Sequence, residues 1–164
     1  MHNINDLIVS KWGAQMMGYK FPCSIGRGGI GIKTQEGDGI TPSGIWEIEF
    51  VMARQDRLRC SASYKINIRD TWSDDPKDPN YNQLNKVNNL YSFENLWRAD
   101  SVYDLVAVTN FNRKTIRPGL GSAIFLHAWR QPRYPTEGCV AFSRQNLIWI
   151  LNNWGKKSKI IIRS

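Results

Sequence analysis

The sequence predicts a mainly β fold with one or two short α-helices. Short runs rich in β-branched and aromatic residues recur along the 164-residue chain, and glycine, proline or polar clusters separate them. This spacing is typical of strands joined by turns. Only one stretch, near the C-terminus, has the apolar spacing of an amphipathic helix. Together these patterns favour a mostly antiparallel β architecture.

The expected elements follow the chain in a simple order. Strands are expected at residues 7–9, 21–25, 45–52, 64–68, 105–108, 123–126 and 160–162. The helix is expected to begin after Ser143, a good N-cap residue, and to end before Gly155. One face of this helix carries Leu147, Ile150, Leu151 and Trp154. Because it follows Gly138-Cys139 so closely, we expect it to pack beneath that turn.

The length suits one domain over residues 1–164. A chain of this size buries roughly 70% of its unfolded surface, so its core requires no metal or disulfide. The three cysteines, an odd number, are expected to be free thiols in a reducing compartment. One internal histidine and scattered cysteines do not supply a zinc ligand set, so neither a metal nor a cofactor is expected.

Residues 70–100 form a long polar excursion that we expect to be a cap loop over a cleft. Loops of this length in a compact domain are usually functional or disordered. The aromatic residues Trp72, Tyr81, Tyr91 and Trp97 argue against disorder, because they give the segment surface to bury. Its acidic residues lack the spacing of a calcium-binding loop.

A glycine-rich stretch, Gly26 to Gly31, matches a dinucleotide-binding motif by letter only. That motif requires a helix to begin at its third glycine. More glycines and Pro42 follow within thirteen residues, so no helix begins there. The glycines are instead expected in tight turns between strands.

The net charge of +8 is concentrated in the C-terminal part of the chain. Residues 101–164 hold ten Lys or Arg and two Asp or Glu, a net of +8, while residues 70–100 carry a net of −3. A basic cleft attracts acidic substrates, although surface charge also serves solubility. A nucleic-acid-binding β-module is the alternative from another class; the chain has no RNP-like sequence or basic-aromatic repeats, and we expect neither a nucleic-acid nor a membrane partner.

The most chemically informative residues are His127 and Cys139. A lone histidine on an apolar strand is more often a core residue, and most unpaired cysteines are simply buried. Here the pair occurs with Gly138 beside the cysteine, which lets backbone N–H groups approach a developing oxyanion. An imidazole that accepts the thiol proton turns a cysteine into a nucleophile. The other histidine, His2, lies at the N-terminus, so His127 is the expected partner.

Two motifs in the expected order carry a family resemblance. They are Gly-Ser-Ala-Ile-Phe-Leu-His at 121–127 with Thr-Glu-Gly-Cys-Val-Ala at 136–141, and Glu-Gly-Asp-Gly-Ile-Thr-Pro-Ser-Gly at 36–44. From about residue 5 onward the chain resembles the L,D-transpeptidase (YkuD-type) catalytic domain, which implies a β-sandwich-like fold. Glu137 stands where secreted members often carry a second histidine, and the span from His127 to Cys139 is shorter than in those enzymes.

The resemblance implies an acyl-transfer enzyme for peptidoglycan stem peptides. Cys139 would be the nucleophile, His127 the base, Gly138 part of the oxyanion site and the Ala128 carbonyl the partner that orients His127, with Glu137 or Asp104 as alternatives for the last role. Candidate substrate contacts are Arg98, Tyr103, Trp129 and Thr136. We expect an L,D-carboxypeptidase that releases D-Ala from tetrapeptide during peptidoglycan recycling; the alternative is an L,D-transpeptidase that forms 3–3 crosslinks. A carbapenem is an expected covalent inhibitor.

The N-terminus predicts a cytoplasmic protein. Asp6 stands where a signal peptide has basic residues, no run of seven apolar residues follows, and no segment is long enough to span a membrane. A periplasmic location would apply if an N-terminal segment had been removed.

Overall fold

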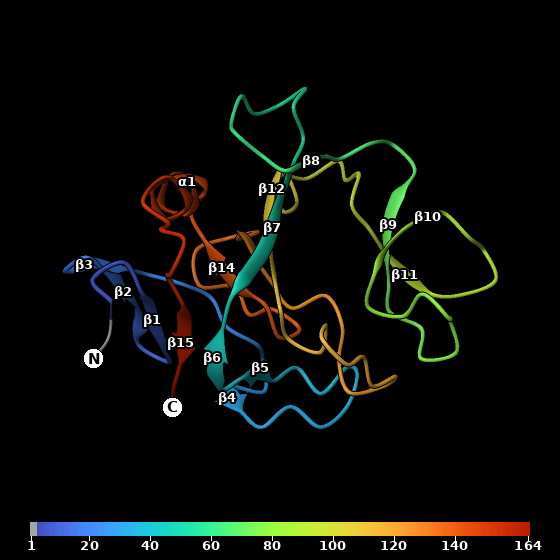
Figure 1. The fold of residues 1–164 in the computed structure, drawn as a ribbon, viewed down its shortest axis with the longest axis horizontal. Coiled ribbons are helices and arrows are strands. Elements are labelled where there is room, and N and C mark those ends of the chain that lie inside the picture. The colour runs from blue at the N-terminus through green and yellow to red at the C-terminus, as the bar shows by residue number, and fades with distance from the viewer. Residues whose placement is uncertain (1–2) are drawn as a thin grey trace.

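The computed structural model describes residues 3–164, and His2 lies outside the described residues. Its first sheet has five strands in the order β3 (Tyr19–Phe21), β2 (Gly13–Met16), β1 (Leu7–Ser10), β15 (Ile160–Ile162) and β6 (Gly44–Trp46). The N- and C-terminal strands β1 and β15 pair in parallel at its centre and lie side by side (Figure 1).

A second five-stranded sheet carries the residues of greatest interest. Its order is β14 (Val140–Phe142), β13 (Phe125–Ala128), β12 (Leu105–Thr109), β7 (Ile48–Ala53) and β8 (Tyr64–Lys65). The chain passes from the first sheet to the second at Glu47, between β6 and β7. Because side chains alternate along a strand, residues two apart face the same way. On β12, Leu105 and Ala107 therefore enter one core, while Val106 and Val108 enter another.

The first core lies between the two sheets and is closed by the helix α1 (Arg144–Asn152). Leu147 and Ile150 of this helix are fully buried there, and the helix contacts β13 and β14. Ser143 caps it, because its Oγ accepts a hydrogen bond of 3.2 Å from the Asn146 N–H. The helix therefore packs on the face of the second sheet opposite to the one that carries Cys139, as expected.

The second core covers the other face of the second sheet. It is built against residues 70–100, which contain the small sheet β10 (Leu84–Lys86), β9 (Asp70–Ser73) and β11 (Phe93–Asn95). Figure 1 shows this small sheet on the side of the molecule away from β1–β3. Trp72 and Leu96 are fully buried in this core. A further short pair, β4 (Ile30–Gly31) with β5 (Thr41–Pro42), brackets the loop between them.

The mainly β prediction is confirmed, and α1 is the one helix in the described part of the chain. Seven of the eleven strand pairings in the described residues are antiparallel, as expected, and four are parallel: β1–β15, β4–β5, β7–β8 and β13–β14. Three expected strands differ: the one at 21–25 overlaps β3 only at Phe21, the one at 45–52 is divided into β6 and β7, and the one at 64–68 stops at Lys65. The chain turns after Lys65 because the Asp70 carboxylate accepts the Asn67 N–H at 2.7 Å.

All three cysteines are free thiols, as expected. Among residues 3–164, the structure contains no helix that is both long and apolar enough to cross a membrane.

The helix packing gives a first prediction. Leu147→Ala removes a fully buried side chain from the first core and is expected to lower the free energy of unfolding by about 2–5 kcal/mol. Leu90→Ala, at a side chain that is 81% exposed, is the matched control and should stay within about 0.5 kcal/mol of the unsubstituted protein. Urea unfolding followed by tryptophan fluorescence measures both. Equal losses in the two variants would contradict this packing.

Candidate functional site

Cys139 and His127 lie on one face of the second sheet. The strands β13 and β14 pair in parallel with Leu126 opposite Val140, so Cys139 stands beside Phe125 and two positions from the level of His127. Both side chains point away from the first core. Cys139 is 8% exposed and His127 is 6% exposed.

A glycine is required directly before the thiol. Gly138 has φ of 141°, and a Cβ there would lie 2.8 Å from the Ile40 carbonyl oxygen. Side-chain hydroxyls then hold the turn: Thr136 Oγ1 donates to the Cys139 carbonyl at 2.7 Å and accepts from the Gly138 N–H at 3.2 Å. Since the Gly138 N–H is engaged, its predicted role in an oxyanion site requires exchange of that bond.

The thiol itself has two backbone partners. Cys139 Sγ donates to the Ala123 carbonyl oxygen at 3.0 Å and accepts from the Phe125 N–H at 3.4 Å. A carbonyl accepts only a protonated thiol, so this arrangement belongs to the neutral form of Cys139.

His127 is oriented by the backbone. Its Nδ1 lies 2.7 Å from the Ala128 carbonyl oxygen, which only accepts, so Nδ1 carries the hydrogen and Nε2 is free to take a proton. The edge of the Tyr103 ring packs on the imidazole, with centroids 5.4 Å apart. The two alternative partners are engaged elsewhere, Asp104 with Arg57 at 3.1 Å and Glu137 with Arg27 at 2.8 Å.

Burial keeps both groups neutral at rest. It raises the pKa of Cys139 to about 12 and lowers the pKa of His127 to about 4. Sequence reasoning expected an imidazole-activated thiolate; the structure favours a neutral thiol beside a neutral imidazole. The proton must therefore move when the thiol attacks, rather than before.

The sequence analysis missed a clamp formed by Tyr81 and Asn82. Tyr81 Oη accepts from the Gly121 N–H at 2.9 Å, and Asn82 Oδ1 accepts from the Ala123 N–H at 3.1 Å. Ala123 has φ of 52°, a left-handed conformation that alanine seldom adopts. Its carbonyl is the acceptor of the Cys139 thiol, so residues 70–100 fix the resting position of this thiol. The one sequence signal was a pair of hydrogen-bonding residues inside the segment that was expected to be a cap loop.

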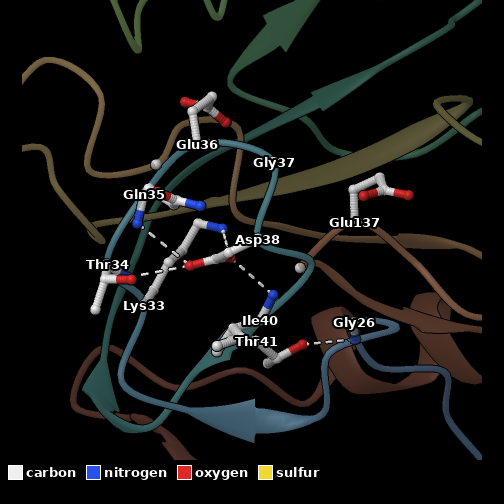
Figure 2. Close-up of polar contacts among 12 residues, drawn as sticks. Gly26, Lys33, Thr34, Gln35, Glu36, Gly37, Asp38, Ile40, Thr41 and Glu137 are labelled. Carbon is white, nitrogen blue, oxygen red and sulfur yellow. Dashed lines mark hydrogen bonds and ion pairs between the residues drawn. The ribbon is translucent and has the colours of Figure 1, made fainter.

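The second motif folds around a buried ion pair, shown in Figure 2. Lys33 Nζ lies 2.6 Å from Asp38 Oδ1, and the Asp38 carboxylate also accepts from the backbone N–H groups of Thr34, Gln35 and Ile40. Burial by itself raises the pKa of Asp38, but these donors lower it to about 2. The lowered pKa stabilises the fold above the ordinary pKa of aspartate, and this contribution is lost as the pH falls towards 2.

This loop is tied to both parts of the first motif. A Cβ at Gly121 would lie 2.2 Å from Lys33 Cε, so glycine there makes room for the buried lysine. Thr41 Oγ1 accepts from the Gly26 N–H at 2.8 Å and donates to the Cys139 carbonyl at 3.4 Å. In Figure 2, Glu36 and Glu137 extend away from the Asp38 cluster.

One pocket of about 360 Å³ brings the predicted site residues together. Its lining includes Cys139, His127, Arg98, Tyr103, Trp129 and Thr136. Gly138 and Ala128 are not among its lining residues. Gly138 is part of the turn that holds Cys139, and the Ala128 carbonyl accepts a hydrogen bond from Nδ1 of His127.

The pocket is not the uniformly basic cleft that the charge distribution suggested. Its charged lining residues are Glu36, Asp74, Glu94 and Glu137 on one hand and Arg98 and Arg130 on the other. The basic C-terminal part of the chain supplies only Arg130 and Glu137 of these. The other four come from segments that the fold brings to the pocket.

A second prediction concerns the pH dependence of Cys139. Because its pKa is raised to about 12 and that of His127 is lowered to about 4, the resting enzyme should hold no thiolate–imidazolium pair. In a Cys23→Ser/Cys60→Ser background, iodoacetamide alkylation of Cys139 should rise about tenfold per pH unit from pH 6 to 9. A rate that is flat between pH 5 and 8 would reveal an ion pair and contradict this description.

A third prediction concerns the Lys33–Asp38 pair. Lys33→Met leaves the Asp38 carboxylate buried without its counter-ion and is expected to cost about 3–5 kcal/mol of stability. Lys77→Met, at an exposed lysine, is the control. Both are measured by urea unfolding at pH 7. Unchanged stability in Lys33→Met would show that the pair does not hold this loop.

The comparisons with known proteins agree with the geometry. No curated protein and no solved structure matched the chain. The model of the YkuD family, described as the L,D-transpeptidase catalytic domain, matches residues 8–162, which include both motifs, the clamp and the pocket. The chain therefore belongs to the L,D-transpeptidase catalytic-domain family of peptidoglycan enzymes.

Proposed function

We propose that this protein is a cysteine-dependent L,D-carboxypeptidase that releases the terminal D-alanine from peptidoglycan tetrapeptides. The observation that carries the proposal is the placement of Cys139 and His127 on one sheet face, in one pocket. The Ala128 carbonyl holds Nδ1 of His127, which leaves Nε2 as the proton acceptor. This is the arrangement that nucleophilic acyl transfer by a thiol requires.

The reaction follows from these two groups. Cys139 Sγ attacks the carbonyl carbon that precedes D-alanine while His127 Nε2 takes the thiol proton. The C–N bond then breaks, the imidazolium gives its proton to the departing amine, and a thioester remains on Cys139. Water then attacks the thioester carbonyl while His127 Nε2 takes a proton from that water. The C–S bond breaks, and the imidazolium returns the proton to the Cys139 sulfur, which restores the thiol. A neutral resting imidazole is ready for both proton transfers.

Pocket size supports water as the acceptor. Ligand sites commonly span about 300–1,000 Å³, and this pocket, at about 360 Å³, is near the lower end. We infer that the end of one stem peptide fills most of this space and that water reaches the thioester. We propose soluble muropeptides as substrates, in cytoplasmic peptidoglycan recycling, with Arg98, Tyr103, Trp129 and Thr136 as substrate contacts.

An L,D-transpeptidase that forms 3–3 crosslinks is the second candidate. It would use the same thioester but resolve it with an amine. Glu36, Asp74 and Glu94 in the pocket would attract the cationic amine of such an acceptor, although they would also hold that amine in its protonated form.

The first test of the proposed function is substitution of the thiol. Cys139→Ala should reduce release of D-alanine from purified tetrapeptide by several orders of magnitude, because no other group can form the acyl-enzyme. Cys23→Ala and Cys60→Ala, which remove half-buried thiols outside the pocket, should keep most of the activity. Mass spectrometry of the products measures all three. Full activity in Cys139→Ala would end the cysteine-enzyme proposal.

The acceptor is tested separately. With tetrapeptide alone, the expected product is tripeptide plus D-alanine; with added amine acceptor, tripeptide should remain the main product. Crosslinked or amine-exchanged product as the main species would favour the transpeptidase. A carbapenem is expected to add its own mass to the unsubstituted protein and not to Cys139→Ala.

A further inference from the structure

Three carboxylates line the pocket that contains Cys139, and we call them the acidic wall: Glu36, Asp74 and Glu94. Glu36 belongs to the loop between β4 and β5, Asp74 directly follows β9, and Glu94 lies on β11. All three side chains are half-buried. Two of them come from the excursion at residues 70–100, so this wall exists only in the folded protein.

None of the three carboxylates has a cationic partner. Within residues 3–164, none of them takes part in an ion pair. Their side-chain partners are neutral hydroxyls: Tyr81 donates to Glu36, Ser92 donates to Asp74 at 2.5 Å, and Tyr103 donates to Glu94 at 3.5 Å. Hydroxyl donors orient a carboxylate without neutralising it.

The carboxylates of the acidic wall affect the pKa values of one another and of the Cys139 thiol. Burial raises the pKa of Glu94, and the charges of Asp74 and Glu36 raise it further. The charge of Glu94 in turn adds to the burial that raises the pKa of Cys139. Arg98 partly offsets Glu94, but its guanidinium is held by Asp100 through bonds of 2.8 Å and 2.6 Å. The wall therefore leaves uncompensated negative charge close to the nucleophile.

A second observation points to a missing ligand. Ser122 also lines the pocket, is 6% exposed, and its buried Oγ makes no hydrogen bond of normal geometry in the described residues; the hydroxyl close to it is that of Tyr81. A buried hydroxyl whose hydrogen bonding is incomplete is costly, and a bound ligand is one way to complete it. Ser122 stands between Gly121 and Ala123, whose backbone positions are fixed by Tyr81 and Asn82.

We propose that the acidic wall and Ser122 Oγ form a subsite for a primary ammonium group of the substrate. An ammonium offers three donors and one positive charge, which matches several separate carboxylates and a hydroxyl oxygen. Among residues 3–164, no three His, Cys, Asp or Glu side chains are gathered closely enough to hold a metal ion.

The inference rests on the proposed function for the identity of the ammonium. A stem tetrapeptide with diaminopimelate as its third residue carries a side-chain amine beside the carbonyl that Cys139 attacks. A second stem peptide that acts as the acceptor would bring the same kind of amine into the pocket. An amine that carboxylates hold as an ammonium has no lone pair for attack. The wall therefore recognises the donor peptide and does not activate an acceptor.

The test compares two tetrapeptides that differ only at the side-chain amine of diaminopimelate, free in one and acetylated in the other. For the unsubstituted enzyme, acetylation should raise KM about tenfold or more and change kcat little. In Asp74→Asn/Glu94→Gln this ratio should fall to near one. Asp75→Asn, which changes a neighbouring carboxylate outside the pocket, should keep the full ratio. The ratio between substrates cancels any effect of Glu94 on Cys139 itself. An unchanged ratio in the double variant would overturn the subsite.

A binding readout separates this inference from the proposed function. In the Cys23→Ser/Cys60→Ser background, Nα-acetyl-lysine should slow alkylation of Cys139 at pH 8.5, whereas Nα-acetyl-norleucine should not, and the double wall variant should abolish the difference. If the lysine derivative protects Cys139 but no tetrapeptide is turned over, the subsite is supported and the proposed carboxypeptidase activity is rejected. Turnover without protection or discrimination would reject the subsite alone. Wall variants that reduce only amine-exchanged product, with trimming unchanged, would assign the ammonium to an acceptor and overturn the donor assignment.

Discussion

The parallel pairing of β13 with β14 is the constraint on which the site depends. With Leu126 opposite Val140, the strand alternation places Phe125, His127 and Cys139 on one face and Leu126 and Val140 in the first core. A shift by one residue would turn the thiol into the apolar core. The packing of α1 and the first sheet on the opposite face holds this register, so the core that stabilises the fold also directs the Cys139 side chain into the pocket.

Burial then decides how the pair can react. It keeps the Cys139 thiol and the His127 imidazole neutral, and two backbone carbonyls complete the arrangement: Ala123 accepts from the thiol and Ala128 from Nδ1. Because Ala123 is held by Asn82, the excursion at residues 70–100 influences chemistry that its own side chains do not perform. A site of this kind is protected from adventitious thiol reactions and becomes reactive only when a substrate gives the thiol an electrophile to attack.

Charge is organised locally and not by the net charge of the chain. The protein carries a formal net charge of +8, yet Glu36, Asp74 and Glu94 line the pocket without cationic partners. Arg98 and Arg130 line the same pocket. Such a mixed lining suits a substrate that carries both ammonium and carboxylate groups, because each charge finds an opposite one.

Local sequence determined those features that depend on neighbours in the chain. Strand-forming runs predicted the mainly β fold, and Ser143 with the amphipathic pattern predicted α1. The setting of Gly138, Cys139 and His127 pointed to a pair of residues that the fold brings into one pocket. The strands β2 and β9–β11 were missed for two reasons: β2, which forms a hairpin with β1, has no β-branched or aromatic residue, and β9 pairs with β10 and β11 across intervening polar segments. The parallel pairing of β1 with β15 is far less local, because it joins Leu7 to Ile160.

Tertiary structure alone decided the charges and contacts of the pocket. The sequence placed Glu36, Asp74 and Glu94 in three separate segments, and nothing in their local spacing relates them. Likewise, the engagement of Ala123 by Asn82 spans 41 residues, and that of Phe125 with the thiol spans 14. The sequence specifies which chemical groups are present. The distances between them, their burial and the resulting pKa values arise only when folding brings together groups that are far apart in sequence and removes water from them.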